Sequence, residues 1–166
     1  MSSDATSITI KKTITLKTTI FTLAFCAPLI FNGSQIITGS IINTLLFISA
    51  AKLSKRVLPF LAVIPSLGAV SHGVLFGAFT IYLIYFLPFI WIGNYLLMRI
   101  AKSNNVLTAA IVKSMFLYGI AYVFVSFHVV PKIFLTAMGI LQFITALVGG
   151  VIAIGVLKYI LKSTNE

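Results

Sequence analysis

The chain has 166 residues, of which 60% are hydrophobic and 8% are charged, and its formal net charge is +10. About a quarter of the residues in a soluble domain are charged, so this composition excludes that class and indicates an integral membrane protein. The basic surplus does not indicate nucleic-acid binding, because the aromatic residues lie within apolar stretches and not on a basic face.

Six apolar stretches approach the roughly 20 residues that a helix needs to cross a bilayer. In chain order they cover residues about 14–31, 36–51, 58–76, 79–98, 106–129 and 133–157. The third and fourth meet at Phe76, Gly77 and Ala78, a link so short that it predicts a helical hairpin. Because these stretches consume most of the chain, we predict one all-α membrane domain over residues 1–166, a bundle of six transmembrane helices.

The basic residues alternate between the gaps that separate these stretches, which predicts the orientation of the bundle. Ten of them fall on one side: Lys11, Lys12, Lys17, Lys52, Lys55, Arg56, Arg99, Lys102, Lys158 and Lys162. The opposite loops hold Lys132 alone, and Lys113 lies within the fifth stretch. Since basic loops stay in the cytoplasm, we expect a multi-pass protein of the cell (inner) membrane with both termini cytoplasmic.

The sequence lacks the residues on which most catalysis and ion coupling depend. Its two acidic residues are Asp4 and Glu166, so no apolar stretch carries a carboxylate for a proton relay. There is no GxxxxGK[ST] loop for ATP. The two histidines, His72 and His128, have no companions at metal-ligand spacing. We therefore expect no enzymatic activity, no metal site and no cofactor.

Neutral polar groups gather in the half of the predicted bundle that faces away from the basic loops. They are the candidate ligand-binding residues, namely Asn32, Gln35, Thr38, Asn43, His72, Tyr85, His128 and Gln142. Buried polar groups in a bilayer need partners, so one interpretation is hydrogen bonding between helices and an interfacial belt of tyrosines. The other is a pocket, open to the outside, for a small and largely neutral ligand.

Two further residues and one helix face have alternative interpretations. Lys113 is expected to extend its ammonium to the cytoplasmic interface, or else to contact an anion or a partner protein. Trp91 is expected to pack in the core, or else to serve as a platform for a ligand. Thr18, Thr22 and Cys26 follow one another at four-residue spacing, which predicts a shallow groove for a helix of this chain or of another subunit.

Two short segments carry a resemblance to a known family. Residues 32–43 contain a Gln-x-x-Thr-Gly-x-x-x-Asn run, and residues 88–94 read Pro-Phe-Ile-Trp-Ile-Gly-Asn. With six spans and no ATPase motif, the chain resembles the substrate-binding S subunits of energy-coupling factor (ECF) transporters whose substrate is unassigned. The resemblance covers the architecture of the whole chain, although the motifs themselves are short.

The resemblance implies high-affinity binding of a vitamin-like micronutrient from outside. It also implies a transmembrane T subunit and two ATPase subunits as partners. The family's surface for the T subunit usually carries alanines, whereas Thr18, Thr22 and Cys26 stand here. Metal-specific relatives use an N-terminal histidine, and Met1–Asp4 has none, which disfavours nickel and cobalt. The alternatives are a non-catalytic assembly protein and a stand-alone facilitator.

Overall fold

The computed structural model describes residues 2–31, 34–72, 77–102 and 105–164, and every regular element within them is helical. The elements are α1 (Ser2–Ile30), α2 (Gln35–Lys52), α3 (Leu58–His72), the 3₁₀ helix η1 (Gly77–Tyr82), α4 (Leu83–Ala101), α5 (Val106–Ser126), α6 (Ile133–Met138) and α7 (Ile140–Thr164). The predicted all-helical fold is confirmed for these residues.

Four helical segments of the described chain are long and apolar enough to cross a membrane. They are Gln35–Lys52, Leu83–Ala101, Val106–Ser126 and Ile133–Tyr159, the last of which joins α6 and α7. Ile14–Ile30 and Leu58–Ser71 form shorter apolar helices. Large apolar side chains on these helices, such as Phe60, Met115 and Val151, are 67–69% exposed, as expected of a surface that faces lipid.

Two of the predicted spans differ from regular helices in the structure. The fourth does not begin as an α-helix, because its first residues form η1. The last divides at Gly139, where α6 ends and α7 begins. A Cβ at Gly139 would lie 2.7 Å from the carbonyl oxygen of Leu135 and 2.8 Å from Cδ2 of Tyr118. The glycine thus lets the break fit against α5.

The helices enclose two clusters of buried side chains. One joins α1, α2, α3, α4, α5 and α7 through small and aliphatic residues, among them Ala24, Leu46 and Leu97. The other joins α3, α4, α5 and α6 and contains Phe86 stacked on Phe134, with ring centroids 5.1 Å apart. A bilayer gives little hydrophobic drive for helices to associate, so close packing of this kind must hold them together.

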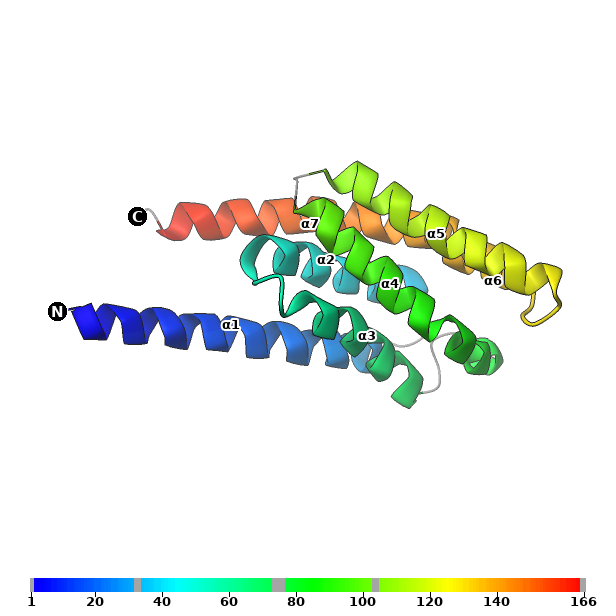
Figure 1. Cartoon of the computed structure of the whole chain (residues 1–166), viewed down its shortest axis with the longest axis horizontal. Coiled ribbons are helices and arrows are strands. Elements are labelled where there is room, and N and C mark those ends of the chain that lie inside the picture. The colour runs from blue at the N-terminus through cyan, green and yellow to red at the C-terminus, as the bar shows by residue number, and fades with distance from the viewer. Residues whose placement is uncertain (1, 32–33, 73–76, 103–104, 165–166) are drawn as a thin grey trace.

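The two termini lie at the same end of the bundle, as Figure 1 shows. The end of α2, the start of α3, the end of α4 and the start of α5 lie on the same side, and α1 and α7 extend beyond them towards the termini. The turn between α5 and α6 lies at the opposite end. Lys52, Lys55, Arg56, Arg99 and Lys102 therefore belong to the end with the termini, which we call the basic end, and Lys132 belongs to the other.

The packing of α1 against α3 depends on Gly68, because a Cβ there would overlap the carbonyl oxygen of Phe25. We expect Gly68→Ala to lower the free energy of unfolding by about 1–3 kcal/mol, the usual cost of overpacking. Gly119→Ala is the control, since nothing lies within 4 Å of a Cβ there. Thermal unfolding in detergent, followed by circular dichroism, measures both. Equal midpoints for the two variants would contradict the packing of α1 on α3.

Candidate functional site

A buried polar network joins α2, α5 and α7 in the middle of the bundle. Lys113 on α5 is 3% exposed, and its Nζ donates a hydrogen bond to Oδ1 of Asn43 at 2.7 Å. Nδ2 of Asn43 donates to Oγ1 of Thr145 at 3.1 Å, and this hydroxyl donates to the carbonyl of Gln142 at 3.2 Å. The prediction that Lys113 extends to the interface is therefore wrong, because its amino group donates a hydrogen bond to an acceptor inside the bundle.

Glycines allow α2 and α7 to approach closely enough for this network. A Cβ at Gly39 would lie 2.9 Å from Cγ2 of Thr145, and one at Gly149 would lie 2.7 Å from Cβ of Asn43. Side chains at either position would push the two helices apart. The hydrogen bond between Asn43 and Thr145 then could not form.

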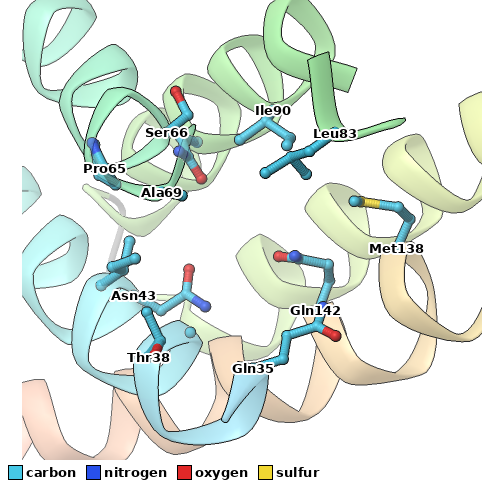
Figure 2. Close-up of a pocket in the computed structure, with 13 residues that line it drawn as sticks. Gln35, Thr38, Asn43, Pro65, Ser66, Ala69, Leu83, Ile90, Met138 and Gln142 are labelled. Carbon is cyan, nitrogen blue, oxygen red and sulfur yellow. The ribbon is translucent and has the colours of Figure 1, made fainter. Parts of the chain in front are cut away.

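A cavity of about 70 Å³ lies beside this network, and its lining includes the first residues of α2 and α4 and the last residue of α6. These helix ends lie away from the end of the bundle that holds the termini (Figure 1). Its polar lining consists of Gln35, Thr38, Asn43, Ser66, Asn94 and Gln142, and its apolar lining includes Ile42, Pro65, Ala69, Leu83, Ile90 and Met138. Figure 2 shows Gln35, Thr38, Asn43 and Gln142 across the cavity from Ser66, Leu83 and Ile90. Helices far apart in sequence thus bring neutral polar groups to one place.

Several polar side chains of this lining donate hydrogen bonds to backbone carbonyls. Nε2 of Gln35 donates to the carbonyl of Ala137 at 2.9 Å, and Nδ2 of Asn94 donates to the carbonyl of Ala62 at 3.0 Å. A carbonyl only accepts, so it fixes the orientation of each amide, with the NH₂ group towards it and the amide oxygen away. The hydroxyl of Thr38 likewise donates to the carbonyl of Phe31 at 2.6 Å, which leaves its oxygen as an acceptor.

Ser66 and Gln142 complete the polar lining. The hydroxyl of Ser66 donates to the carbonyl of Val63 at 2.7 Å and accepts from Nε1 of Trp91 at 2.6 Å. The Gln142 side chain makes no hydrogen bond to any residue that the structure describes, and it is half-buried. No described residue therefore bonds the two donors or the acceptor of this amide.

The lining as a whole has more free acceptors than free donors. Gln35, Thr38 and Asn94 each donate one hydrogen bond, and their side-chain oxygens accept none of the bonds above. The amide of Gln142 is not bonded to any described residue. The lining contains no carboxylate. Such a site favours an uncharged ligand that donates hydrogen bonds.

The predicted ligand-binding residues fall into three groups. Gln35, Thr38, Asn43 and Gln142 line the cavity. Tyr85 is exposed on α4, and His128 is exposed in the turn after α5 with a φ of 56°, so neither reaches the cavity. Asn32 and the side chain of His72 lie outside the part of the chain that the structure describes. A ligand-binding role for the first group stays a prediction.

Ser66 and Thr145 were not predicted from the sequence, and Lys113 lies in surroundings that differ from those predicted. Nothing in the local sequence separates Ser66 from other small polar residues of membrane helices. Its partner Trp91 was assigned to packing, and the hydrogen bond between them depends on how α3 meets α4. The available signal for polar contacts between α3 and α4 was Asn94, because an amide in the middle of an apolar stretch requires a hydrogen-bond partner.

The predicted groove on α1 is one wall of an exposed cleft. Thr18 and Thr22 line this cleft together with Pro59, Phe60 and other residues of α3 and its N-terminal approach, and its volume is about 930 Å³. Cys26 does not line it and is partly buried. Docking of a partner helix on this face stays a prediction.

Comparison of the chain with protein-family models, with curated proteins and with solved structures found no match.

Removal of the acceptor from Lys113 tests the polar network. We expect Asn43→Leu to lower the free energy of unfolding by about 2 kcal/mol, because hydrogen bonds to charged groups contribute about 1.5–3 kcal/mol. The double variant Asn43→Leu/Lys113→Met should regain most of that stability, since it removes both partners. Chemical denaturation in detergent gives the three values.

Ser126→Ala is the control for this cycle, because its exposed hydroxyl bonds only the carbonyl of Tyr122 within its own helix. It should change stability by less than about 0.5 kcal/mol. Additive losses at Asn43 and Lys113 would show that the two side chains do not interact.

Proposed function

We propose that this protein is a non-catalytic binding subunit of the membrane, and that its cavity takes a small, uncharged, hydrogen-bond-donating solute for uptake into the cell. The observation that supports the proposal is the amide of Gln142, which bonds no described residue and lines the cavity together with the oxygens of Gln35, Thr38 and Asn94. These groups lie on the surface of the cavity, and a ligand with several N–H or O–H groups would donate hydrogen bonds to them.

The volume of the cavity supports a ligand of few atoms. One water needs about 10–15 Å³, and pockets for drug-sized ligands span about 300–1,000 Å³. At about 70 Å³ the cavity has room for several waters or one compact solute. A flat heterocycle of vitamin size would require α3 and α4 to move away from α2 and α7. Pro65 and Pro88 interrupt hydrogen bonding within α3 and α4, which favours bending of these helices.

We also propose that six helices cross the inner membrane of the cell and that both termini lie in the cytoplasm. The shorter apolar helices Ile14–Ile30 and Leu58–Ser71 would cross along with the four longer segments. Support comes from the common position of the two termini and from the collection of Lys and Arg residues at that end of the bundle. The cavity would then lie in the outer half and receive its ligand from outside.

Energy for uptake would come from partner proteins, as in ECF transporters. The chain has no ATP-binding loop, and its two acidic residues stand at the extreme ends of the sequence. The four fixed positions of the Gln-x-x-Thr-Gly-x-x-x-Asn run, Gln35, Thr38, Gly39 and Asn43, all line the cavity. This coincidence supports the resemblance to S subunits, and with it a T subunit and two ATPases as partners.

A second candidate function is membrane assembly without a ligand. It is favoured by the network of Lys113, Asn43 and Thr145, which satisfies its polar groups within the chain. The two candidates differ at Gln142. The network bonds only its backbone carbonyl, and its side chain makes no hydrogen bond to a described residue. Binding at that amide therefore decides between them.

Trp91 is the single tryptophan of the chain and donates to Ser66 in the cavity wall, so its fluorescence should report on binding. Urea, acetamide and acetone are close in size and carry four, two and no N–H donors. At millimolar concentrations we expect a saturable change with urea, a weaker one with acetamide and none with acetone. Gln142→Leu should weaken urea binding about ten-fold, the equivalent of roughly one hydrogen bond.

Tyr122→Phe is the matched control, because Tyr122 is exposed on α5 and lies outside the cavity. It should bind urea as the unmodified protein does. An equal response to acetone would overturn the preference for donors. No saturable response to any of the three probes would leave assembly as the better account.

Cysteine labelling tests the proposed topology. In a Cys26→Ala background, Val129→Cys lies in the turn after α5, and Ser54→Cys lies between α2 and α3, both at exposed positions. A membrane-impermeant maleimide should label the first in intact cells and the second only after permeabilisation. The reverse pattern would place the basic end outside and contradict the proposed orientation.

A further inference from the structure

A second and larger cavity lies at the basic end of the bundle, away from the proposed ligand site. Its volume is about 480 Å³, and residues near the ends of α2, α4 and α7 and at the start of α5 line it. α2 and α7 both end on the side where the termini lie (Figure 1). Neither the resemblance nor the proposed uptake function gives this cavity a role.

The walls of this cavity are apolar. Phe47, Val106, Ile154 and Leu157 contribute large side chains, and small residues between them leave the space open. Gly150 is needed here, because a Cβ would overlap Cγ1 of Val106 and lie 3.2 Å from the ring of Phe47. The surroundings suit a hydrocarbon chain.

Two cations, Lys52 and Lys158, complete the lining, and both are exposed. Lys52 belongs to the last turn of α2, and Lys158 lies near the end of α7. No acidic residue lines the cavity, and neither lysine pairs with a carboxylate in the part of the chain that the structure describes. The cavity therefore has an apolar wall and two lysine ammonium groups that no described acidic residue neutralises.

We infer that this cavity binds an anionic phospholipid of the leaflet that the basic end faces, which is the inner leaflet in the orientation proposed above. Its acyl chain lies along Phe47, Ile154 and Leu157, and its phosphate lies between the ammonium groups of Lys52 and Lys158. Lysines near a membrane surface attract anionic lipids, and basic pockets between transmembrane helices hold their headgroups. A zwitterionic lipid offers the same chains without the net negative charge, so the site selects by headgroup.

Native mass spectrometry of the full chain, with phosphatidylglycerol and phosphatidylcholine of equal chain length in competition, tests this site. The unmodified protein should retain phosphatidylglycerol preferentially. Lys52→Gln/Lys158→Gln should reduce that preference about ten-fold or more, from the attraction that two lysines provide. The matched control is Lys55→Gln/Lys102→Gln, which removes two exposed cations from the same end that do not line the cavity.

Three outcomes would overturn the inference. The first is an equal loss in both double variants, which would indicate a general attraction of the basic end. The second is retention of phosphatidylglycerol by Ala51→Trp, which should fill the cavity from an exposed position and exclude the acyl chain. The third is displacement of the lipid by soluble glycerol phosphate, which would show that the acyl chain plays no part.

The inference does not depend on the proposed solute site. Gln142→Leu alters the other cavity and should leave lipid retention unchanged, and loss of retention in that variant would count against a separate site.

Discussion

The ammonium of Lys113 lies in the middle of an apolar bundle, and Asn43 accepts a hydrogen bond from it. A lysine ammonium only donates, so it requires the oxygen of the Asn43 amide, and the NH₂ group of that amide must then face Thr145. One buried amino group thus fixes the orientation of an amide and holds α2, α5 and α7 in register. Breaking this arrangement would leave that polar group without a partner where water is excluded, and that constraint governs the polar interior.

The cavity beside Asn43 follows from the same rule applied to other helices. Gln35 and Asn94 turn their NH₂ groups to backbone carbonyls, so their oxygens remain for the cavity. The side-chain amide of Gln142 makes no hydrogen bond to any described residue. The hydrogen bonds that stabilise the bundle therefore also determine which ligands its interior can accept. In this protein, packing and proposed binding share side chains, so variants at Asn43 report on stability first.

The two ends of the bundle differ in charge and in what their cavities offer. Neutral oxygens and amides line the smaller cavity, whereas an apolar wall and two lysines form the larger one at the basic end. These lysines pair with no carboxylate among the residues that the structure describes. The same segregation of Lys and Arg that supports a cytoplasmic position for this end makes it attractive to anionic lipids. Orientation in the membrane and lipid selection would then have one electrostatic origin.

The helical class, the membrane character and the division of charge between the two ends were all predictable from the sequence. They depend on composition and on the spacing of Lys and Arg along the chain, which are local properties. Four of the eight residues predicted to bind a ligand line the cavity, because neutral amides and hydroxyls in apolar stretches must turn inward. The break at Gly139, the burial of Lys113 and the pairing of Trp91 with Ser66 were not predictable in this way. Each depends on which helix lies opposite, and residues 25 to 102 positions apart in sequence meet only when the bundle packs. The tertiary structure alone decided which polar groups pair with one another and which remain free.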